Sequence, residues 1–139
     1  MNKLFVDTDV ILDLLGARIP HFHFAALLFT YADKKQIKLF TSPLVLANTF
    51  YILRKQLGSE DARKAIRKLR TIVSVVESSE KAVDLALNSR FTDFEDAIQY
   101  YTALERGLTV IITRNGRDFK VHEIPVLSPE IYLSSKGYV

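Results

Sequence analysis

The sequence predicts an α/β domain with a mainly parallel sheet that is covered by helices on both faces. Five short apolar runs are rich in β-branched and aromatic residues, which is typical of buried strands. Longer segments of helical period separate these runs, and strands that alternate with helices usually pair in parallel. The 139 residues contain no internal repeat and no linker rich in Pro, Gly or Ser, so we expect a single domain over residues 1–139.

Local signals justify these elements in chain order. The predicted strands are residues 4–6, 38–41, 72–76, 109–113 and 126–127, and the predicted helices lie near residues 10–15, 21–35, 43–57, 60–70, 79–89 and 93–106. Asp9 is a candidate N-cap for the first, short helix. Ser42 and Pro43 form an N-cap and a first-turn proline, and Gly58 ends the helix that they begin.

The later helices carry signals of the same kind. Apolar residues recur at helical spacing from Ala62 to Leu69 while basic residues fall between them, which predicts an amphipathic helix with a basic outer face. Thr92 and Glu95 resemble a capping box at the start of the last of these helices, and Gly107 ends that helix.

The composition excludes several kinds of site. The chain has no cysteine, so it cannot form a disulfide framework, a thiolate nucleophile or a Cys-ligated metal centre. His21 and His23 are two residues apart and face different sides of a helix, and with His122 they do not form a zinc motif. No run of about 18 apolar residues occurs, so we expect a cytoplasmic protein without a membrane segment.

The net charge of +3 is unevenly distributed. Between residues 34 and 70 there are ten basic residues against Glu60 and Asp61, a net charge of +8, so the rest of the chain carries −5. This asymmetry predicts one surface that faces phosphates and another that holds a cation. Solvation of helix faces is the alternative explanation for such basic residues.

Acidic residues follow the predicted strands at the edge where ligands bind in open parallel sheets. Asp7, Thr8 and Asp9 come directly after the first strand, and Arg114, Asn115 and Asp118 come after the strand at 109–113. Asp93 and Asp96 open the helix before that strand. Each group has a structural alternative, because acids also cap helices and complement the helix dipole. Mutually repelling carboxylates at one edge favour a hard cation, Mg²⁺ or Mn²⁺.

These motifs together resemble a PIN domain. The motifs are Val6-Asp7-Thr8-Asp9, Ser42 with Asn48, Asp93-Phe94-Glu95-Asp96-Ala97, Thr113-Arg114-Asn115-x-x-Asp118-Phe119, and the stretch from Ile124 to Glu130. The resemblance spans nearly the whole chain, and its Thr-Arg-Asn-x-x-Asp-Phe stretch is the most specific part. It implies a three-layer α/β/α fold with a five-stranded sheet in the order 3-2-1-4-5.

The resemblance also implies an activity and its residues. PIN domains are Mg²⁺- or Mn²⁺-dependent nucleases that act mostly on RNA, and many bacterial ones are toxins of VapC-type toxin-antitoxin pairs. An endoribonuclease toxin is therefore expected, with a small antitoxin protein as partner and a homodimer as the common assembly. The expected catalytic residues and metal ligands are Asp7, Asp96 and Asp118, with Asp93, Asn48, Asn115, Thr113 and Thr8 as auxiliary residues. The residues expected to contact RNA are Arg54, Lys55, Arg63, Lys64, Arg67, Lys68 and Arg114.

One position departs from the family pattern. The helix after the second strand usually supplies a glutamate about where this chain has Asn48. An amide oxygen can ligate a cation, but it brings no charge and cannot act as a base. Asn48 therefore supports an alternative function, a PIN-fold module that binds RNA or a protein without strong catalysis.

A different class of enzyme is the other alternative. Asp7-Thr8-Asp9 after a strand also resembles the nucleophile motif of haloacid-dehalogenase phosphatases. That family normally needs a longer chain and a downstream Lys followed by an acidic pair, for which we find no convincing match.

Overall fold

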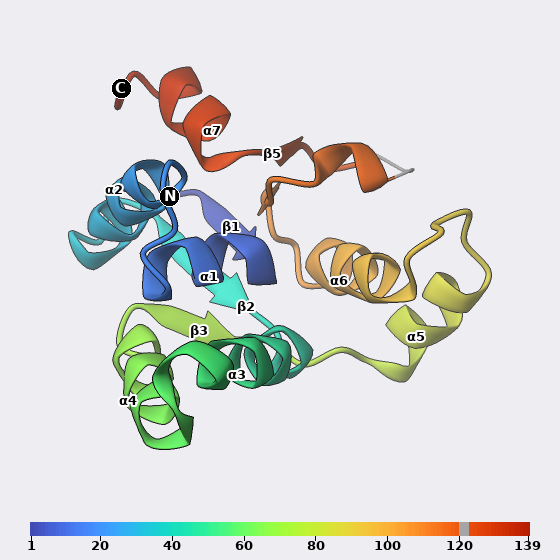
Figure 1. Ribbon diagram of the computed structural model, residues 1–139. Helices are drawn as coiled ribbons and strands as arrows, with labels where there is room; N and C mark the ends of the chain where they lie inside the picture. Colours follow the sequence, from blue (N-terminus) through green and yellow to red (C-terminus); the bar gives the residue numbers. More distant parts are fainter. Residues whose placement is uncertain (120–122) are drawn as a thin grey trace.

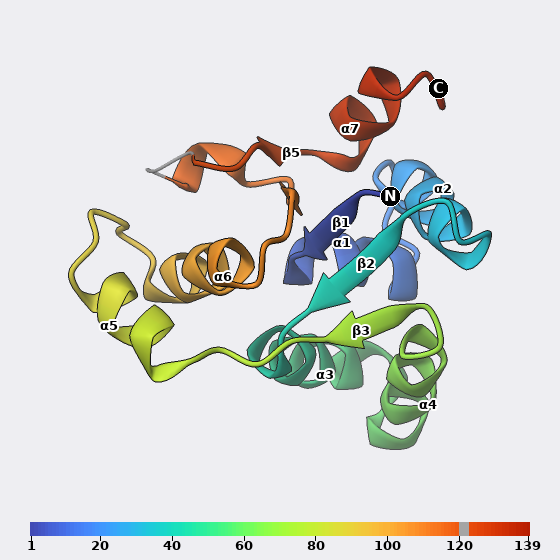
Figure 2. The same ribbon diagram turned by 180° about the vertical axis from the view of Figure 1, so that it is seen from behind.

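A parallel five-stranded sheet in the order β3-β2-β1-β4-β5 forms the centre of the protein (Figures 1 and 2). The computed structural model describes residues 1–119 and 123–139 and, of Asp118, the backbone alone, so His122 lies outside the described residues. The strands are β1 (Lys3–Val6), β2 (Lys38–Thr41), β3 (Val73–Val75), β4 (Val110–Ile112) and β5 (Val126–Leu127). The predicted fold class and strand order are therefore confirmed.

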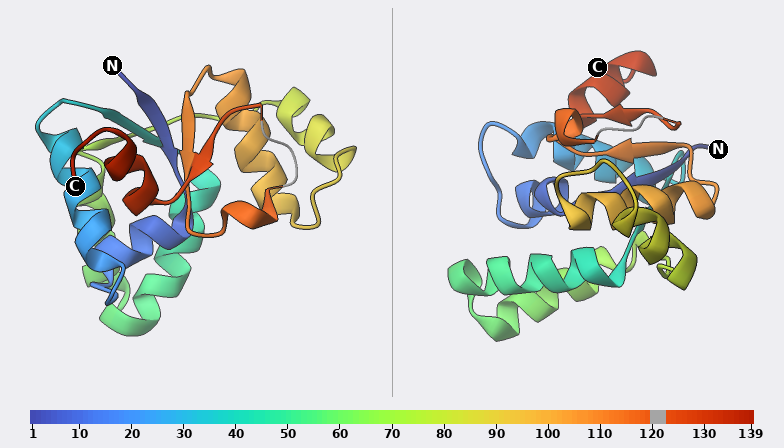
Figure 3. Two further views of the ribbon diagram at one scale, coloured as in Figure 1. Left: turned by 90° about the horizontal axis from the view of Figure 1, so that it is seen from above. Right: turned by 90° about the vertical axis from the view of Figure 1, so that its right-hand side faces the viewer.

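Seven helices accompany these strands within the described residues. They are α1 (Thr8–Leu15), α2 (Phe22–Asp33), α3 (Pro43–Leu57), α4 (Ser59–Leu69), α5 (Glu80–Leu87), α6 (Phe94–Glu105) and α7 (Pro129–Ser135), and a 3-10 turn, η1 (Gly116–Asp118), follows β4. Viewed from above, α1, α2 and α7 lie on one side of the strands, and α5 and α6 lie on the other (Figure 3). The helices thus form the two outer layers of the predicted three-layer arrangement.

The start of α3 confirms its predicted signals. The Ser42 hydroxyl accepts a hydrogen bond from the Val45 backbone N–H at 3.2 Å, and Pro43 occupies the first turn. Gly58 ends the helix at φ +84°, a conformation that residues with a side chain rarely adopt. Between α3 and α4 the chain therefore reverses at once, and Figure 3 shows the two helices side by side as a hairpin.

Two predicted caps are wrong. The N-cap of α1 is Asp7, whose carboxylate accepts from the Thr8 N–H at 2.8 Å, and Asp9 lies inside the first turn. The N-cap of α6 is Asp93, which accepts from the Asp96 N–H at 3.0 Å, so Thr92 forms no capping box with Glu95. In each case the chain offers several acceptors within three residues, and the cap is the one whose backbone is extended just before the first helical turn, Asp7 or Asp93.

The core fixes the sheet edge that carries the acids. The side chains of Leu4, Phe5 and Val6 in β1 are fully buried, as are those of Ile111 and Ile112 in β4. In the register between these strands Val6 pairs with Ile112, so the next residues of both strands emerge side by side. Among the described residues, no helix is both long enough and apolar enough to cross a membrane.

Candidate active site at the carboxyl ends of the strands

Asp7 and Thr113 meet where β1 and β4 end. The Asp7 backbone N–H extends the ladder to the Ile112 carbonyl at 3.0 Å. The buried Thr113 hydroxyl lies 3.2 Å from Asp7 Oδ2 and 3.2 Å from Asp9 Oδ2. A hydroxyl has one proton to donate, so Thr113 can satisfy only one of the two carboxylates at a time.

Burial and repulsion make Asp7 unusually basic for a carboxylate. Its pKa rises from 3.8 to about 6, first because burial disfavours the charged form and next because the Asp9 carboxylate is close. Asp93 raises it further, whereas the hydrogen bonds from Thr8 and Thr113 oppose the rise. A cation beside Asp7 would remove this cost, so the site favours a positively charged ligand.

Asp9 is held by the loop after β4. The Arg114 backbone N–H donates to Asp9 Oδ2 at 2.9 Å. Burial raises the pKa of Asp9, while this hydrogen bond and the Arg114 charge lower it. Asp9 is thus not the cap that the sequence suggested but a carboxylate that ties α1 to the end of β4.

An open pocket of about 430 Å³ extends from these carboxylates toward α3 and α6. Its walls come from the first residues after β1, the middle of α3, the start of α6 and the loop after β4. The lining residues are Asp7, Thr8, Asp9, Leu12, Arg18, Asn48, Tyr51, Ile52, Glu95, Asp96 and Asn115. The pocket therefore brings together five predicted site residues, namely Asp7, Thr8, Asn48, Asp96 and Asn115.

Glu95 is a site residue that the sequence reasoning missed. Asn48 Nδ2 donates a hydrogen bond to Glu95 Oε2 at 2.9 Å, and both side chains line the pocket. Deeper in the protein, the Ser42 hydroxyl donates to Gln99 Oε1 at 2.8 Å and holds the same two helices together. The family pattern has a glutamate at position 48, where this chain has Asn48. A carboxylate from α6, that of Glu95, therefore lies next to this position. The pair Glu95-Asp96, two adjacent acids at a helix start, was the signal that could have revealed it.

Asp13 is a second residue whose role the sequence analysis did not predict. Its side chain is 1% exposed, and Arg114 binds it with Nε at 2.6 Å and Nη2 at 3.1 Å. A lone acid inside the apolar run Ile11-Leu12-Asp13-Leu14-Leu15 was the available signal. Arg114 was predicted to contact RNA, and its guanidinium makes its strongest contacts with this buried carboxylate. The predicted RNA contact of Arg114 remains untested.

The remaining predicted acids occupy different positions. Asp93 caps α6 and is exposed, close enough to Asp7 to raise its pKa but outside the pocket lining. Asp118 ends η1, and its side chain lies outside the described part of the structure. Within the described residues no three carboxylate or imidazole groups lie close enough to hold a metal ion as they stand.

Six of the seven predicted RNA-binding residues lie on a separate surface, whereas the seventh, Arg114, lies in the loop after β4. Arg54 and Lys55 are exposed in the last turn of α3. The other four are exposed on α4, where Lys64 pairs with Glu60 at 3.7 Å. They are Arg63, Lys64, Arg67 and Lys68. The helix hairpin α3–α4 thus carries a basic surface beside the acidic pocket.

The chemistry of the pocket suits a hard cation and a phosphate. Carboxylate, amide and hydroxyl oxygens are the donors that Mg²⁺ and Mn²⁺ prefer. Arg18 is the one cationic side chain among the described residues that line the pocket. Acids that repel one another in a half-buried pocket, next to a basic surface, form an arrangement that can bind a phosphodiester through a cation.

Comparison with known proteins adds an independent finding. The sequence profile described as PIN domain matches residues 3–117. Ribonuclease VapC1 from Aquifex aeolicus (strain VF5) is 28% identical over 137 residues, which cover 93% of this chain and 92% of that protein.

Solved structures share the fold. A chain in the DNA-bound VapBC complex from Salmonella typhimurium superimposes with a TM-score of 0.69 at 17% identity, over 93% of this chain and 99% of that chain. Mycobacterium tuberculosis VapC20, a sarcin-ricin loop cleaving toxin, superimposes with a TM-score of 0.62 at 23% identity, over 78% of this chain and 86% of that chain. At these identities the likeness supports the fold.

Proposed function

Because the chain belongs to the PIN domain family, we propose that it is an endoribonuclease that hydrolyses RNA phosphodiester bonds with Mg²⁺ or Mn²⁺. One observation carries the proposal: Asp7, Asp96 and Glu95 line a single pocket at the carboxyl ends of the strands. Ribonuclease VapC1, which is similar over most of its length, supports the RNA substrate. The raised pKa of Asp7 supports the cation, because a positive charge would relieve the cost of its ionisation.

The proposed metal ligands are Asp7, Asp96 and Asp118, with Glu95 as a fourth carboxylate. When bound, the ion supplies charge that stabilises the transition state at phosphorus and activates water. Thr113 holds Asp7 Oδ2 in place through its hydroxyl, and Thr8 presents the backbone N–H that binds the same carboxylate. Asn48 orients Glu95 through its amide. Asn115 lines the same pocket, and the charge of Asp93 acts on Asp7 from outside the pocket lining.

The basic surface on α3 and α4 positions the RNA. Lys and Arg contacts to phosphates supply affinity that does not depend on sequence and that falls as salt rises. Arg54 and Lys55 on α3 and the four basic residues of α4 provide these contacts in the proposed complex.

We also propose a biological setting for the activity. The Salmonella typhimurium structure is a VapBC complex, and a Klebsiella pneumoniae chain of similar fold is in a toxin-antitoxin complex. By the same relationship we propose that this chain is a toxin with a small antitoxin partner. From the family resemblance we further propose that it forms a homodimer, and from its composition that it acts in the cytoplasm. Growth arrest on expression, reversed by the product of an adjacent small reading frame, would test the toxin role.

Cleavage of RNA by purified protein tests the activity. With Mn²⁺ the wild type should cleave RNA, EDTA should stop the reaction, and Asp7→Asn should abolish it while the circular dichroism spectrum stays native. Cleavage that Asp7→Asn leaves unchanged would refute the site. RNA that is bound but not cleaved would favour the binding module, and hydrolysis of a phosphomonoester with RNA left intact would favour the phosphatase.

A further inference from the structure

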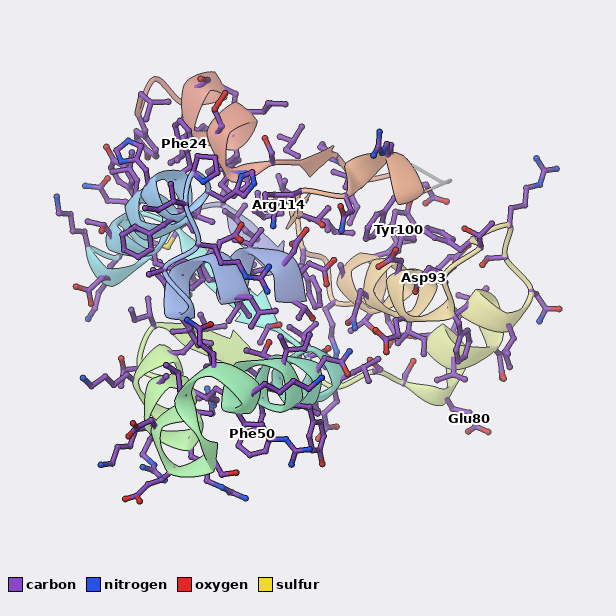
Figure 4. The ribbon with its side chains drawn as sticks, viewed as in Figure 1. Phe24, Phe50, Glu80, Asp93, Tyr100 and Arg114 are labelled. Carbon is purple, nitrogen blue, oxygen red and sulfur yellow. The ribbon has the colours of Figure 1, made fainter. Side chains whose placement is uncertain are left out.

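A second hollow lies between α3 and α4, next to the acidic pocket. It has a volume of about 470 Å³ and an apolar floor with an arginine rim. The lining residues are Leu46, Ala47, Phe50, Tyr51, Arg63, Ile66 and Arg67. We call it the α3–α4 groove, and Figure 4 marks its position by the side chain of Phe50.

Each of two aromatic rings in this groove has an arginine guanidinium against it. The guanidinium carbon of Arg63 lies 5.3 Å from the centre of the Phe50 ring, and that of Arg54 lies 5.0 Å from the centre of the Tyr51 ring. Tyr51 is 55% exposed, so part of its ring surface faces solvent. An exposed ring among arginines is typical of surfaces that bind single-stranded nucleic acid, because bases stack on the ring and phosphates pair with the cations.

Tyr51 also joins the groove to the candidate active site. Its side chain lines both the α3–α4 groove and the acidic pocket that contains Asp7. A strand with one phosphodiester at the acidic pocket can therefore continue over Tyr51 into the groove. No acidic side chain belongs to the described lining of the groove, so its rim is complementary to phosphates.

We propose that the α3–α4 groove binds an unpaired segment of the RNA substrate, with one base stacked on Tyr51 and the adjoining phosphates paired with Arg63 and Arg67. This inference rests on the proposed ribonuclease function. An apolar floor suits bases whose faces are free, and in a duplex those faces are covered by the neighbouring base pairs. The groove therefore selects single-stranded RNA next to the bond that is cut.

Binding of short RNAs without cleavage provides the test. The full-length protein carries Asp7→Asn as a common background and the buffer contains EDTA. The probe is a labelled RNA of about 12 nucleotides, within the range of single-strand site sizes, either alone or annealed to its complement. Fluorescence anisotropy measures both affinities across a series of salt concentrations.

Substitutions at Tyr51 separate stacking from charge. Tyr51→Ala should weaken binding of the single strand about 5- to 150-fold, the range expected for one base–aromatic stack, and should leave the dependence on salt unchanged. Tyr51→Phe should retain the affinity, because it keeps the ring. Arg67→Gln should instead reduce the slope of log affinity against log salt by about 0.7, as expected for one lost phosphate contact on a single strand.

The absence of tryptophan from the chain allows a direct readout. Tyr51→Trp introduces a single tryptophan at the proposed stacking position, and single-stranded RNA should quench its fluorescence more strongly than the duplex does. Unchanged affinity of Tyr51→Ala for the single strand, or equal quenching by single-stranded and duplex RNA, would overturn the proposal. Either result would instead favour a protein as the ligand of the groove. RNA cleavage that depends on Asp7 would then still stand, whereas failure of the proposed function would appear as absent cleavage in the wild type.

Discussion

Replacing Asp7 by asparagine should make the metal-free protein more stable while it removes the proposed activity. A carboxyl group whose pKa is 3.8 in the unfolded chain and about 6 in the folded protein opposes folding once it ionises. Each pH unit between these values costs about 1.4 kcal/mol, so the full penalty is about 3 kcal/mol above pH 6. Water that reaches the half-buried side chain reduces it, and we expect a gain of about 2–3 kcal/mol for Asp7→Asn at pH 7.5.

The sign of the pH dependence follows from the raised pKa. The folded protein binds a proton at Asp7 more tightly than the unfolded chain does, so this group favours folding below pH 3.8 and loses that contribution as the pH rises to about 6. The asparagine side chain of the variant does not titrate, so the advantage of Asp7→Asn should shrink to about 1 kcal/mol at pH 4.5. Urea unfolding followed by circular dichroism at both pH values, with EDTA present, measures the difference.

A matched control comes from Asp84→Asn. Asp84 is exposed on α5, and its replacement should change the free energy of unfolding by no more than about 0.5 kcal/mol. If Asp7→Asn is no more stable than the wild type at pH 7.5, or if its gain is the same at pH 4.5, the ionised Asp7 carboxylate does not oppose folding. Mn²⁺ should stabilise the wild type but not Asp7→Asn, since a ligand that binds the folded state raises its stability.

Two further predictions concern side chains around the pocket. Glu95→Gln should weaken Mn²⁺ binding about tenfold by calorimetry, because a carboxylate is lost, and Asn48→Glu combined with Glu95→Gln should restore it. Glu80→Gln is the control, since Glu80 is also an exposed acid in the first turn of its helix. It lies on α5, away from the site (Figure 4). Equal binding of Mn²⁺ by all these variants would contradict a role for Glu95. Arg114→Ala should destabilise the protein by about 3–5 kcal/mol, because it strips the main partner from the buried Asp13. Adding Asp13→Asn should recover part of that loss in urea unfolding, and a destabilisation below about 1 kcal/mol would show that the ion pair is dispensable.

Much of the fold could be predicted because its signals are local. Strands at 38–41 and 126–127 and the helix at 43–57 have the predicted limits, since apolar runs, an N-cap serine and a C-terminal glycine act within a few residues of the element. The strand predicted at 72–76 is shorter, Val73–Val75, because the Ile72 N–H bonds to the Leu69 carbonyl in the turn that leaves α4. Helix caps were less predictable where several side-chain acceptors lay next to one helix start, as at α1 and α6.

The sequence alone determined which segments became strands and helices and which residue types reached the edge of the sheet. The tertiary structure alone decided which side chains came into contact with one another. Asn48 and Glu95 are 47 residues apart and Asp13 and Arg114 are 101 residues apart, yet each pair is joined by hydrogen bonds. Such pairs depend on strand register and on how two helices pack, and neither is encoded in the spacing of nearby residues. For the same reason the sequence predicted a group of acidic residues and a group of basic residues. The arrangement of α3, α4 and α6 then placed the acidic pocket beside the basic groove.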